Sequence, residues 1–363
     1  MTNDELAVPE TPADVTPAWL TRALGQRWPG IEVRSVVGEP LGEGIGQISL
    51  LQRLTLEHAG AAEAPRHMVL KMHTTHADML GVAVRFRMYE REANFYNRFA
   101  DRVPLRTPEV YHAATEGLER CVMLMEDMSS WHSPDQLAGP TLEEAELAVD
   151  SLATLTAAFW NSPELSDHAS WLPDFNVGYM SDTGNDYRQC LPEFLRRYET
   201  KLPPGSADAA RTIADRYDDL TRILSTGPQV LTHYDYRLEN MFFRNDAAEA
   251  FCALDWQLVM RARPGWDIAY FMGTNLPVSF LDEHGEALRD RYYQQLQSNG
   301  VQGYARADLE ADLAIGTMAM TGIPIIGGAN ADLSNPRNEA LFTEVGSRAF
   351  GAVIGNDCLA YLP

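Results

Sequence analysis

A short stretch after an apolar run combines residue types that could move a proton and hold a metal ion. The segment LTHYDYRLEN, residues 231–240, contains His233, Asp235 and Asn240. An aspartate at the end of a buried strand can accept a proton from a hydroxyl group. A single histidine after a strand is more often a hydrogen-bonded structural residue, so His233 alone does not indicate catalysis.

The residues that follow predict a β-hairpin with a loose turn near 245–250. MFFR and FCALDWQ flank the turn-prone sequence NDAAEA, and Asn240 and Asp255 are nearly equidistant from its centre. Folding of this hairpin would bring both side chains to one end. Amide and carboxylate oxygens are the hard ligands that Mg²⁺ prefers, with substrate phosphates completing its coordination.

A second pair of charged residues is predicted in the first half of the chain. Lys71 lies in the apolar strand HMVLKMH, and a helix is expected over roughly 82–100. Glu92 falls on the apolar stripe of that helix, which is formed by Met88, Phe95, Tyr96 and Phe99. Because a buried carboxylate is costly unless it is paired, we expect an ion pair with Lys71 that aims the ammonium group at nucleotide phosphates.

Other interpretations of this pair remain open from the sequence. Lys71 could be a solubilising residue of an edge strand. Glu92 could pair with Arg85 or Arg91 of its own helix, and Glu90 is the rival partner for Lys71.

A glycine-rich turn precedes these elements. LGEGIGQIS contains Gly42, Gly44 and Gly46 between two expected strands. A flexible backbone there could fold over phosphates, although a plain hairpin turn has the same glycine content.

The elements that must position these residues change in type along the chain. A capped helix is expected from Thr16 and Pro17 onward, and strands are expected between Ile31 and Met125. A capping box at 141–144 begins a helix-rich region. Helical patterns recur near 186–200, 206–225, 282–298 and 305–320, whereas TGIPIIGGANADLS, residues 321–334, is typical of a glycine-rich loop.

The charge and composition of the chain argue against some classes of function. The net charge is −22, which argues against a nucleic-acid partner and against anionic membrane surfaces. No apolar run approaches membrane-spanning length. The four cysteines are widely spaced, and the acidic, proline-containing N-terminus differs from a signal peptide, so we expect a cytoplasmic protein.

Taken in order, these motifs resemble the aminoglycoside phosphotransferase and choline kinase superfamily, and more closely its ecdysteroid kinase-like branch of small-molecule kinases. The resemblance covers roughly residues 15–275. It rests on eight motifs, each in the expected order: EGIG, VLK, REANFY, MLMEDM, LATLTAAFW, HYDYRLEN, LDWQ and PGWDIAYF.

The resemblance implies an α+β, bilobal protein-kinase-like fold with a small β-rich N-lobe and a larger, mostly helical C-lobe. Residues 1–30 would form an N-terminal arm and helix. Residues 31–127 would form the N-lobe with the nucleotide loop and hinge, and residues 128–363 the C-lobe with the catalytic loop.

The resemblance also implies phosphorylation of a small-molecule hydroxyl group by ATP or GTP with Mg²⁺. Asp235 would orient the hydroxyl and take its proton, while Arg237, where protein kinases carry a lysine, could neutralise charge on the transferred group. Nucleotide-binding roles fall to Gly44, Gly46, Lys71, Glu92 and the hinge residues Met125, Glu126 and Asp127. Asn240 and Asp255 would hold the metal, and His233 and Asp267 would support the catalytic loop.

Two positions depart from the superfamily pattern. Many relatives have histidine where Thr156 stands and glycine where Tyr234 follows the loop histidine. Neither residue handles phosphate, so the departures concern the packing of the catalytic loop.

Other functions remain open. A protein kinase is disfavoured because Trp-Gln follows Asp255, and only about a dozen residues separate it from Asp267. A nucleotide-binding pseudokinase is weakened by retention of the base and both metal ligands. An antibiotic or secondary metabolite is the preferred acceptor, with a choline-like alcohol, a sugar or a steroid as alternatives.

Overall fold

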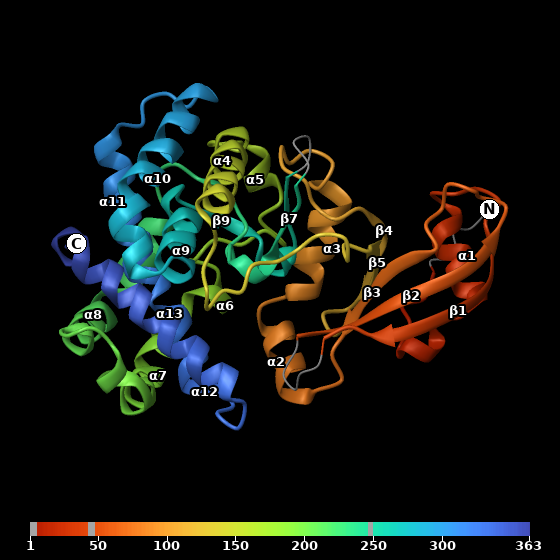
Figure 1. Cartoon of the computed structure of the whole chain (residues 1–363), viewed down its shortest axis with the longest axis horizontal. Helices are drawn as coiled ribbons and strands as arrows, with labels where there is room; N and C mark the ends of the chain where they lie inside the picture. The colour runs from red at the N-terminus through yellow and green to blue at the C-terminus, as the bar shows by residue number, and fades with distance from the viewer. Residues whose placement is uncertain (1–5, 43–47, 246–249) are drawn as a thin grey trace. The chain divides into compact units, whose positions relative to one another are not determined.

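The computed structural model describes residues 6–42, 48–245 and 250–363, which divide into two compact units (Figure 1). Unit 1 comprises Met1–Arg102, Thr107–Trp131 and Asp255–Leu258. Unit 2 comprises Val103–Arg106, His132–Leu254 and Val259–Pro363. The glycines Gly44 and Gly46 of the expected nucleotide loop lie outside the described residues.

Unit 1 is built on an antiparallel five-stranded sheet. Its strands are β1 (Glu32–Pro40), β2 (Ser49–Ala59), β3 (His67–His73), β4 (Val110–Glu116) and β5 (Arg120–Glu126). They follow the order β1-β2-β3-β5-β4, so β3 is the central strand. β4 lies within the region 31–125 where strands are expected, although none of its residues is fully buried and its apolar pattern is weak.

Helix α1 (Pro17–Gly25) confirms the predicted N-terminal helix. The Thr16 side chain accepts a hydrogen bond from the backbone of Trp19, and Pro17 occupies the first helical position. Val8 and Val15, which precede the helix, are buried in the same hydrophobic core as Leu20. This core covers one face of the sheet with α1.

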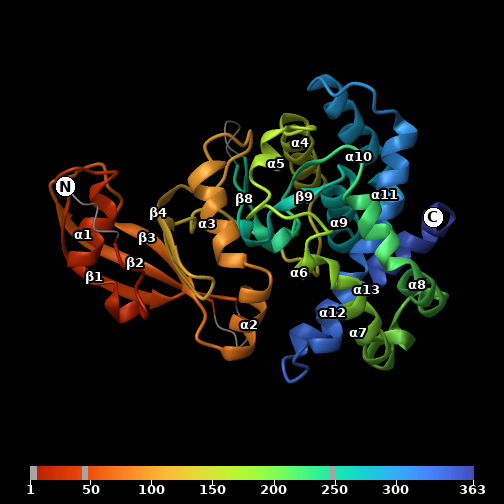
Figure 2. The same ribbon diagram turned by 180° about the vertical axis from the view of Figure 1, so that it is seen from behind.

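The expected single helix over 82–100 is wrong, because two helices are present. They are α2 (Ala77–Arg85) and α3 (Met88–Arg98). Arg87, between them, has a left-handed backbone with φ of 53°, which a continuous helix cannot contain. Helix α3 lies beside β4 and β5, and its apolar stripe is buried as predicted (Figures 1 and 2).

Unit 2 is mainly helical. Its helices are α4 (Leu142–Ala158), α5 (Glu164–Asp167), α6 (Gly178–Ser181), α7 (Thr183–Tyr198), α8 (Ser206–Leu224), α9 (Gly265–Asn275), α10 (Val278–Ser298), α11 (Arg306–Met320), α12 (Gly322–Asn330) and α13 (Pro336–Gly355). The four helical patterns predicted from the sequence correspond to α7, α8, α10 and α11. The capping box at the start of α4 is also present, with Thr141 and Glu144 exchanging hydrogen bonds.

Every residue of α9 is buried, and this helix contacts α4, α11 and α13 (Figure 2). Two small antiparallel ladders adjoin the helices. One pairs β7 (Met241–Phe243) with β8 (Phe251–Ala253), which confirms the predicted hairpin. The other pairs β6 (Val230–Thr232) with β9 (Met260–Ala262), a strand that the sequence did not predict.

The expectation of a glycine-rich loop over 321–334 is wrong, because α12 occupies most of this segment. A Cβ atom on Gly327 would lie 2.5 Å from the ring of Phe342, and one on Gly328 would lie 3.0 Å from the ring of Phe194. The glycines therefore permit close packing of a helix against aromatic rings.

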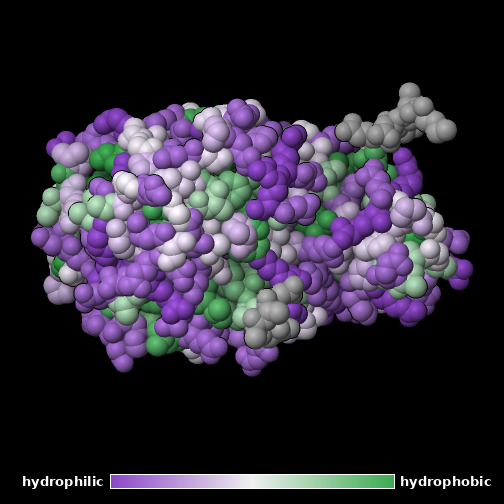
Figure 3. All heavy atoms as spheres, turned by 90° about the horizontal axis from the view of Figure 1, so that it is seen from above, coloured by the Kyte–Doolittle hydropathy of each residue, from purple (hydrophilic) through white to green (hydrophobic). Residues whose placement is uncertain are grey.

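Helices α11 and α12 contradict the expectation that no apolar segment approaches membrane-spanning length. Together, over Arg306–Asn330, they are long and apolar enough to cross a membrane by length and composition. However, 78% of the apolar window is buried inside the structure, as in the core helix of a globular domain. Figure 3 shows hydrophilic residues over most of the face that it presents, in keeping with the charge of −22.

Candidate functional site

The predicted ion pair of Lys71 is present in the core of unit 1. The Lys71 Nζ atom lies 2.7 Å from Oε1 of Glu92 and 2.8 Å from Oδ1 of Asp255. Lys71 is on the central strand and only 6% exposed, so the edge-strand interpretation is wrong. Glu90, the rival partner, pairs instead with Arg87.

Burial and charge determine the protonation of this cluster. Burial by itself would lower the pKa of Lys71, but the adjacent carboxylates of Asp255 and Glu92 raise it overall, so the ammonium stays charged. Burial raises the pKa of Glu92 to about 7, although Lys71 opposes this shift. Among the described residues, Oε2 of Glu92 is buried without a hydrogen-bond partner.

Aromatic packing fixes the segment that carries Asp255. Trp256 stacks on Phe95 of α3, with ring centroids 3.9 Å apart and an interplanar angle of 7°. Asp255 has a left-handed backbone with φ of 60°, and its Oδ2 accepts a hydrogen bond from Gln257. The carboxylate is thus held towards Lys71.

The expected hinge residues lie at the end of β5. Met125 pairs with Val69 of β3 and with Val110 of β4. The backbone N–H of Glu126 donates to Glu109 O, and the carboxylate of Asp127 is bound by Arg53 of β2. The side chain of Asp127 therefore links the end of β5 to β2 within unit 1.

In unit 2, Asp235 lies at the centre of a hydrogen-bond network. Its Oδ1 accepts from the phenol of Tyr270 at 2.7 Å, and its Oδ2 accepts from Nδ2 of Asn240 at 2.9 Å. Arg237 Nε lies 3.2 Å from the same Oδ2. Both carboxylate oxygens are therefore held in place by side chains of unit 2.

The surroundings of Asp235 keep it ionised. Burial opposes ionisation, but Arg237, the Tyr270 hydrogen bond and His233 together lower the pKa of Asp235 below its ordinary value. Burial, followed by the charge of Asp235, raises the pKa of Tyr270 well above its ordinary value, so the phenol remains a donor.

Asp267, on α9, binds the backbone of the loop that contains Asp235. Its two oxygens accept hydrogen bonds from the backbone N–H groups of His233 at 2.7 Å and Tyr234 at 2.8 Å. Burial raises the pKa of Asp267 to about 7, although these two hydrogen bonds lower it. The His233 ring is fully buried, with Nε2 at 2.7 Å from Leu254 O, in agreement with a structural role.

Tyr234 adopts a backbone conformation that glycine tolerates better. Its φ is 73°, in the left-handed region. Its ring stacks on Trp266 with centroids 4.9 Å apart and also contacts Phe175. Aromatic packing therefore holds a strained residue next to Asp235.

Asn240 directly precedes β7 of the hairpin in unit 2. The backbone N–H of Leu254 donates to Asn240 O at 2.9 Å, and Asp255 is the next residue in the chain, the first of the unit 1 segment. Because Nδ2 of Asn240 is bonded to Asp235, the amide oxygen is the group that remains for a ligand.

Sequence reasoning missed two parts of the Asp235 environment. Tyr270 lies three residues after Asp267 in DIAYF, so helical spacing to that expected residue was a usable signal. The other part is a chain of ion pairs from Arg237 to Glu239 and from Glu239 to Arg337, which also pairs with Asp135. Arg337 is 98 residues from Glu239 and gave no local signal.

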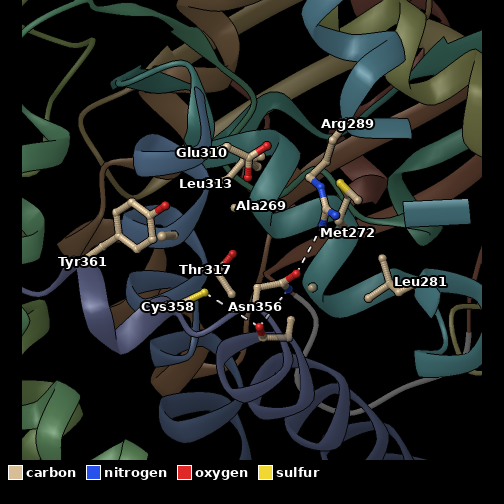
Figure 4. Close-up of a pocket in the computed structure, with 13 residues that line it drawn as sticks. Ala269, Met272, Leu281, Arg289, Glu310, Leu313, Thr317, Asn356, Cys358 and Tyr361 are labelled. Atoms are coloured by element: carbon tan, nitrogen blue, oxygen red, sulfur yellow. Dashed lines mark hydrogen bonds between the residues drawn. The ribbon is translucent and has the colours of Figure 1, made fainter. Parts of the chain in front are cut away.

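A cavity of about 60 Å³ in unit 2 is lined in part by α9 (Figure 4). It is bordered by α9, α10, α11, α13 and the C-terminal residues. None of the predicted site residues lines it. Its lining residues are Ala269, Met272, Gly273, Leu281, Arg289, Glu310, Leu313, Ala314, Thr317, Ala352, Asn356, Cys358 and Tyr361.

The metal-ligand chemistry is that of oxygen donors. Within residues 6–42, 48–245 and 250–363, no three His, Cys, Asp or Glu side chains gather as a metal site. Asn240 in unit 2 and Asp255 in unit 1 each carry a hard oxygen donor, the ligand type that Mg²⁺ prefers.

A comparison with protein-family models matches residues 44–301 to the ecdysteroid kinase-like family. This range is more than half of the chain and contains every predicted site residue. No curated protein sequence matches the chain.

Solved structures with the same fold are small-molecule kinases by name. An ethanolamine kinase of Plasmodium vivax gives a TM-score of 0.56 at 11% identity, over 90% of this chain and 83% of that one. A microcompartment-associated aminopropanol kinase gives 0.55 at 14% identity, over 95% and 99%.

The wild-type aminoglycoside 2'-phosphotransferase-IIIa, in complex with GDP, gives a TM-score of 0.52 at 13% identity, over 94% and 99%. At these identities the likeness concerns the fold, which is the predicted α+β, protein-kinase-like fold.

Proposed function

Because the chain belongs to the ecdysteroid kinase-like family, we propose that it transfers a phosphoryl group from ATP or GTP to a hydroxyl group of a small molecule. The observation that carries this proposal is the environment of Asp235. The carboxylate is 16% exposed, is kept ionised by its surroundings, accepts hydrogen bonds from Tyr270 and Asn240 and pairs with Arg237, as suits a base that accepts a proton from a bound alcohol.

In this proposal each residue has a defined role. Asp235 orients the acceptor hydroxyl and takes its proton, and Arg237 offsets charge on the transferred group. Lys71, held by Glu92, binds the nucleotide phosphates. The backbone from Met125 to Asp127 recognises the base, and Gly44 and Gly46 cover the phosphates.

Asn240 and Asp255 would hold Mg²⁺. When bound, Mg²⁺ neutralises phosphate charge and orients the transferred group. Asp255 accepts a hydrogen bond from Lys71 in this structure. When a nucleotide binds, Lys71 would leave Asp255 and contact a phosphate group instead. His233 and Asp267 keep the loop in shape.

The acceptor class follows from the family and from the acidic charge of the chain, and we prefer an antibiotic or secondary metabolite. Ethanolamine, aminopropanol and aminoglycosides belong in the assay panel because relatives of the same fold carry these acceptors in their names. We further propose a cytoplasmic location, with neither nucleic acid nor membrane as a partner.

The test is release of ADP or GDP in the presence of Mg²⁺ and a panel of hydroxyl compounds. One compound should stimulate release, and Asp235→Ala should lower turnover by orders of magnitude while nucleotide affinity is kept. Asp255→Ala should instead abolish Mg²⁺-dependent nucleotide binding.

Near-normal turnover in Asp235→Ala would overturn the assignment of the base. Mg²⁺-dependent nucleotide binding without any stimulated release would favour a nucleotide-binding pseudokinase.

A further inference from the structure

We propose that Arg337, near the start of α13, is a positioning residue for phosphoryl transfer, because it holds Glu239 and thereby Arg237. This inference rests on the proposed function, in which Arg237 lies beside the base Asp235 and offsets charge on the transferred group. Helix α13 begins after residue 301, where the match to the family model ends. All of these residues belong to unit 2.

A continuous chain of ion pairs leads from α13 to the proposed base. Nη2 of Arg337 donates to Oε1 of Glu239 at 3.0 Å. The other oxygen of Glu239, Oε2, accepts from Nη1 of Arg237 at 2.9 Å, and Nε of Arg237 lies 3.2 Å from Oδ2 of Asp235. Glu239 therefore lies between two arginines and turns one oxygen towards each.

Arg337 is itself held by a second carboxylate. Its Nη2 lies 3.1 Å from Oδ1 of Asp135, and its Nη1 lies 3.4 Å from Oδ2. Oδ1 of Asp135 also accepts from the backbone N–H of Leu137 at 2.9 Å, which ties the carboxylate to its own segment. A planar guanidinium is suited to contacts of this kind at more than one point. Arg337 thus bridges two carboxylates, Asp135 and Glu239, that would repel each other without it.

A second arginine fixes the helix that carries Arg337. Arg348, about three helical turns further on, is 1% exposed and donates to the carbonyl oxygens of Gln136 and Asn275 at 2.8 Å each. Asn275 lies at the end of α9, which packs against α13 (Figure 2), and its Oδ1 accepts from the backbone N–H of Leu238 at 2.9 Å. Helix α13 is therefore tied to the loop that contains Asp235 at a buried point, and Arg337 extends from a fixed support.

Removal of the Arg337 guanidinium would release one side of Glu239. Glu239 and Arg237 would then move as a pair, and these two long side chains would sample several positions. The guanidinium of Arg237 would spend less time beside Asp235, so stabilisation of charge in the transition state would fall. Other residues bind the nucleotide in the proposed function, so its affinity should change little.

The first measurement is steady-state kinetics with ATP, Mg²⁺ and the panel compound that stimulates ADP release most. In Arg337→Met, kcat should fall about fivefold, while KM for ATP changes less than about twofold. Arg337→Lys keeps the positive charge but not the planar fork, and should retain at least about half of the wild-type kcat.

Lys201→Met is the matched control. Lys201 pairs with Glu339 of the same helix, and this ion pair has an exposure similar to that of Arg337 with Asp135. The control should keep the wild-type kcat, and both methionine variants should unfold at similar urea concentrations. A general loss of stability would then not account for the lower kcat of Arg337→Met.

Two further measurements test whether Arg337 acts through Glu239. Adding Glu239→Gln to Arg337→Met should lower kcat by less than the product of the two single losses, because both changes break the same link. Backbone hydrogen exchange of residues 235–240, measured by mass spectrometry without an acceptor, should be at least about threefold faster in Arg337→Met than in the wild type or Lys201→Met.

An unchanged kcat in Arg337→Met, an equal loss in Lys201→Met, or single losses that multiply would overturn the positioning proposal and leave the kinase proposal intact. Absence of stimulated release by the wild type would count against the kinase proposal, and hydrogen exchange would still decide whether Arg337 holds the loop. If Arg337→Met did not fold, Glu239→Gln should show the lower kcat and the faster exchange, and wild-type values in that variant would contradict the proposal.

Discussion

The phenol of Tyr270 donates a hydrogen bond to Oδ1 of Asp235 at 2.7 Å, and three residues earlier on the same helix Asp267 accepts from the backbone of the loop that carries Asp235. Helix α9 therefore holds the proposed base in two ways, through its side chain and through its backbone. Because α9 is buried along its whole length, this support is rigid.

Removal of the Tyr270 hydroxyl should slow turnover. Tyr270→Phe removes a hydrogen bond to an ionised carboxylate, worth about 1.5–3 kcal/mol, and frees the carboxylate to rotate. We expect kcat to fall about tenfold with little change in KM for the nucleotide, as measured by steady-state kinetics. Tyr304→Phe is the control, because that phenol donates to Asp312 at the same distance of 2.7 Å. An equal loss of kcat in both variants would contradict a specific role for Tyr270.

Removal of Lys71 should destabilise the fold as well as nucleotide binding. Lys71→Met leaves the fully buried Glu92 without its partner, and loss of one member of a buried ion pair costs about 3–5 kcal/mol. Adding Glu92→Gln should recover part of this loss, because the amide carries no charge. Urea unfolding measures both changes. Lys201→Met, which removes an exposed pair with Glu339, should cost less than about 1 kcal/mol. A similarly small cost for Lys71→Met would contradict the prediction.

The free energy of unfolding should depend on pH through Asp267. Its pKa is raised to about 7 in the folded state, so the folded protein binds more protons than the unfolded chain between about pH 4 and 7. The stability that Asp267 contributes is therefore fully present below about pH 4 and is lost as the pH rises through 7. Asp267→Asn should be less stable than the wild type, with a deficit larger at pH 5 than at pH 8. A deficit that grows with pH would show that Asp267 is held ionised.

Substitution of Tyr234 by glycine should destabilise the fold less than substitution by alanine. Both substitutions remove the ring stacked on Trp266, which costs about 3–5 kcal/mol. Only alanine keeps a Cβ atom at φ of 73°, and left-handed backbone costs a non-glycine residue about 1–2 kcal/mol. Tyr234→Gly should therefore unfold at higher urea concentration than Tyr234→Ala. The reverse order would show that the backbone at this position relaxes.

Much of the site was predictable because its residues are close in sequence or lie on regular elements. The loop from His233 to Asn240 and the hairpin leading to Asp255 depend on short-range folding. The buried position of Glu92 follows from helical periodicity, and burial of a carboxylate requires a partner, which identified Lys71.

The errors have physical causes as well. The break at Arg87 depends on a left-handed residue in a sequence with good helical periodicity, so no local signal marks it. The glycines of α12 locally favour a loop, because their packing against Phe342 and Phe194 involves residues far away in the chain.

The sequence by itself determined the residue types of the site, their order and the elements that carry them, because periodicity and spacing are local properties. Only the tertiary structure decided which hydrogen-bond and ion-pair partners the polar groups have. The hydrogen bond from Tyr270 to Asp235, the pairing of Arg53 with Asp127 and that of Arg337 with Glu239 join segments tens of residues apart. Such partners are selected by burial and geometry, since a buried polar group takes whichever partner the packed chain brings within reach.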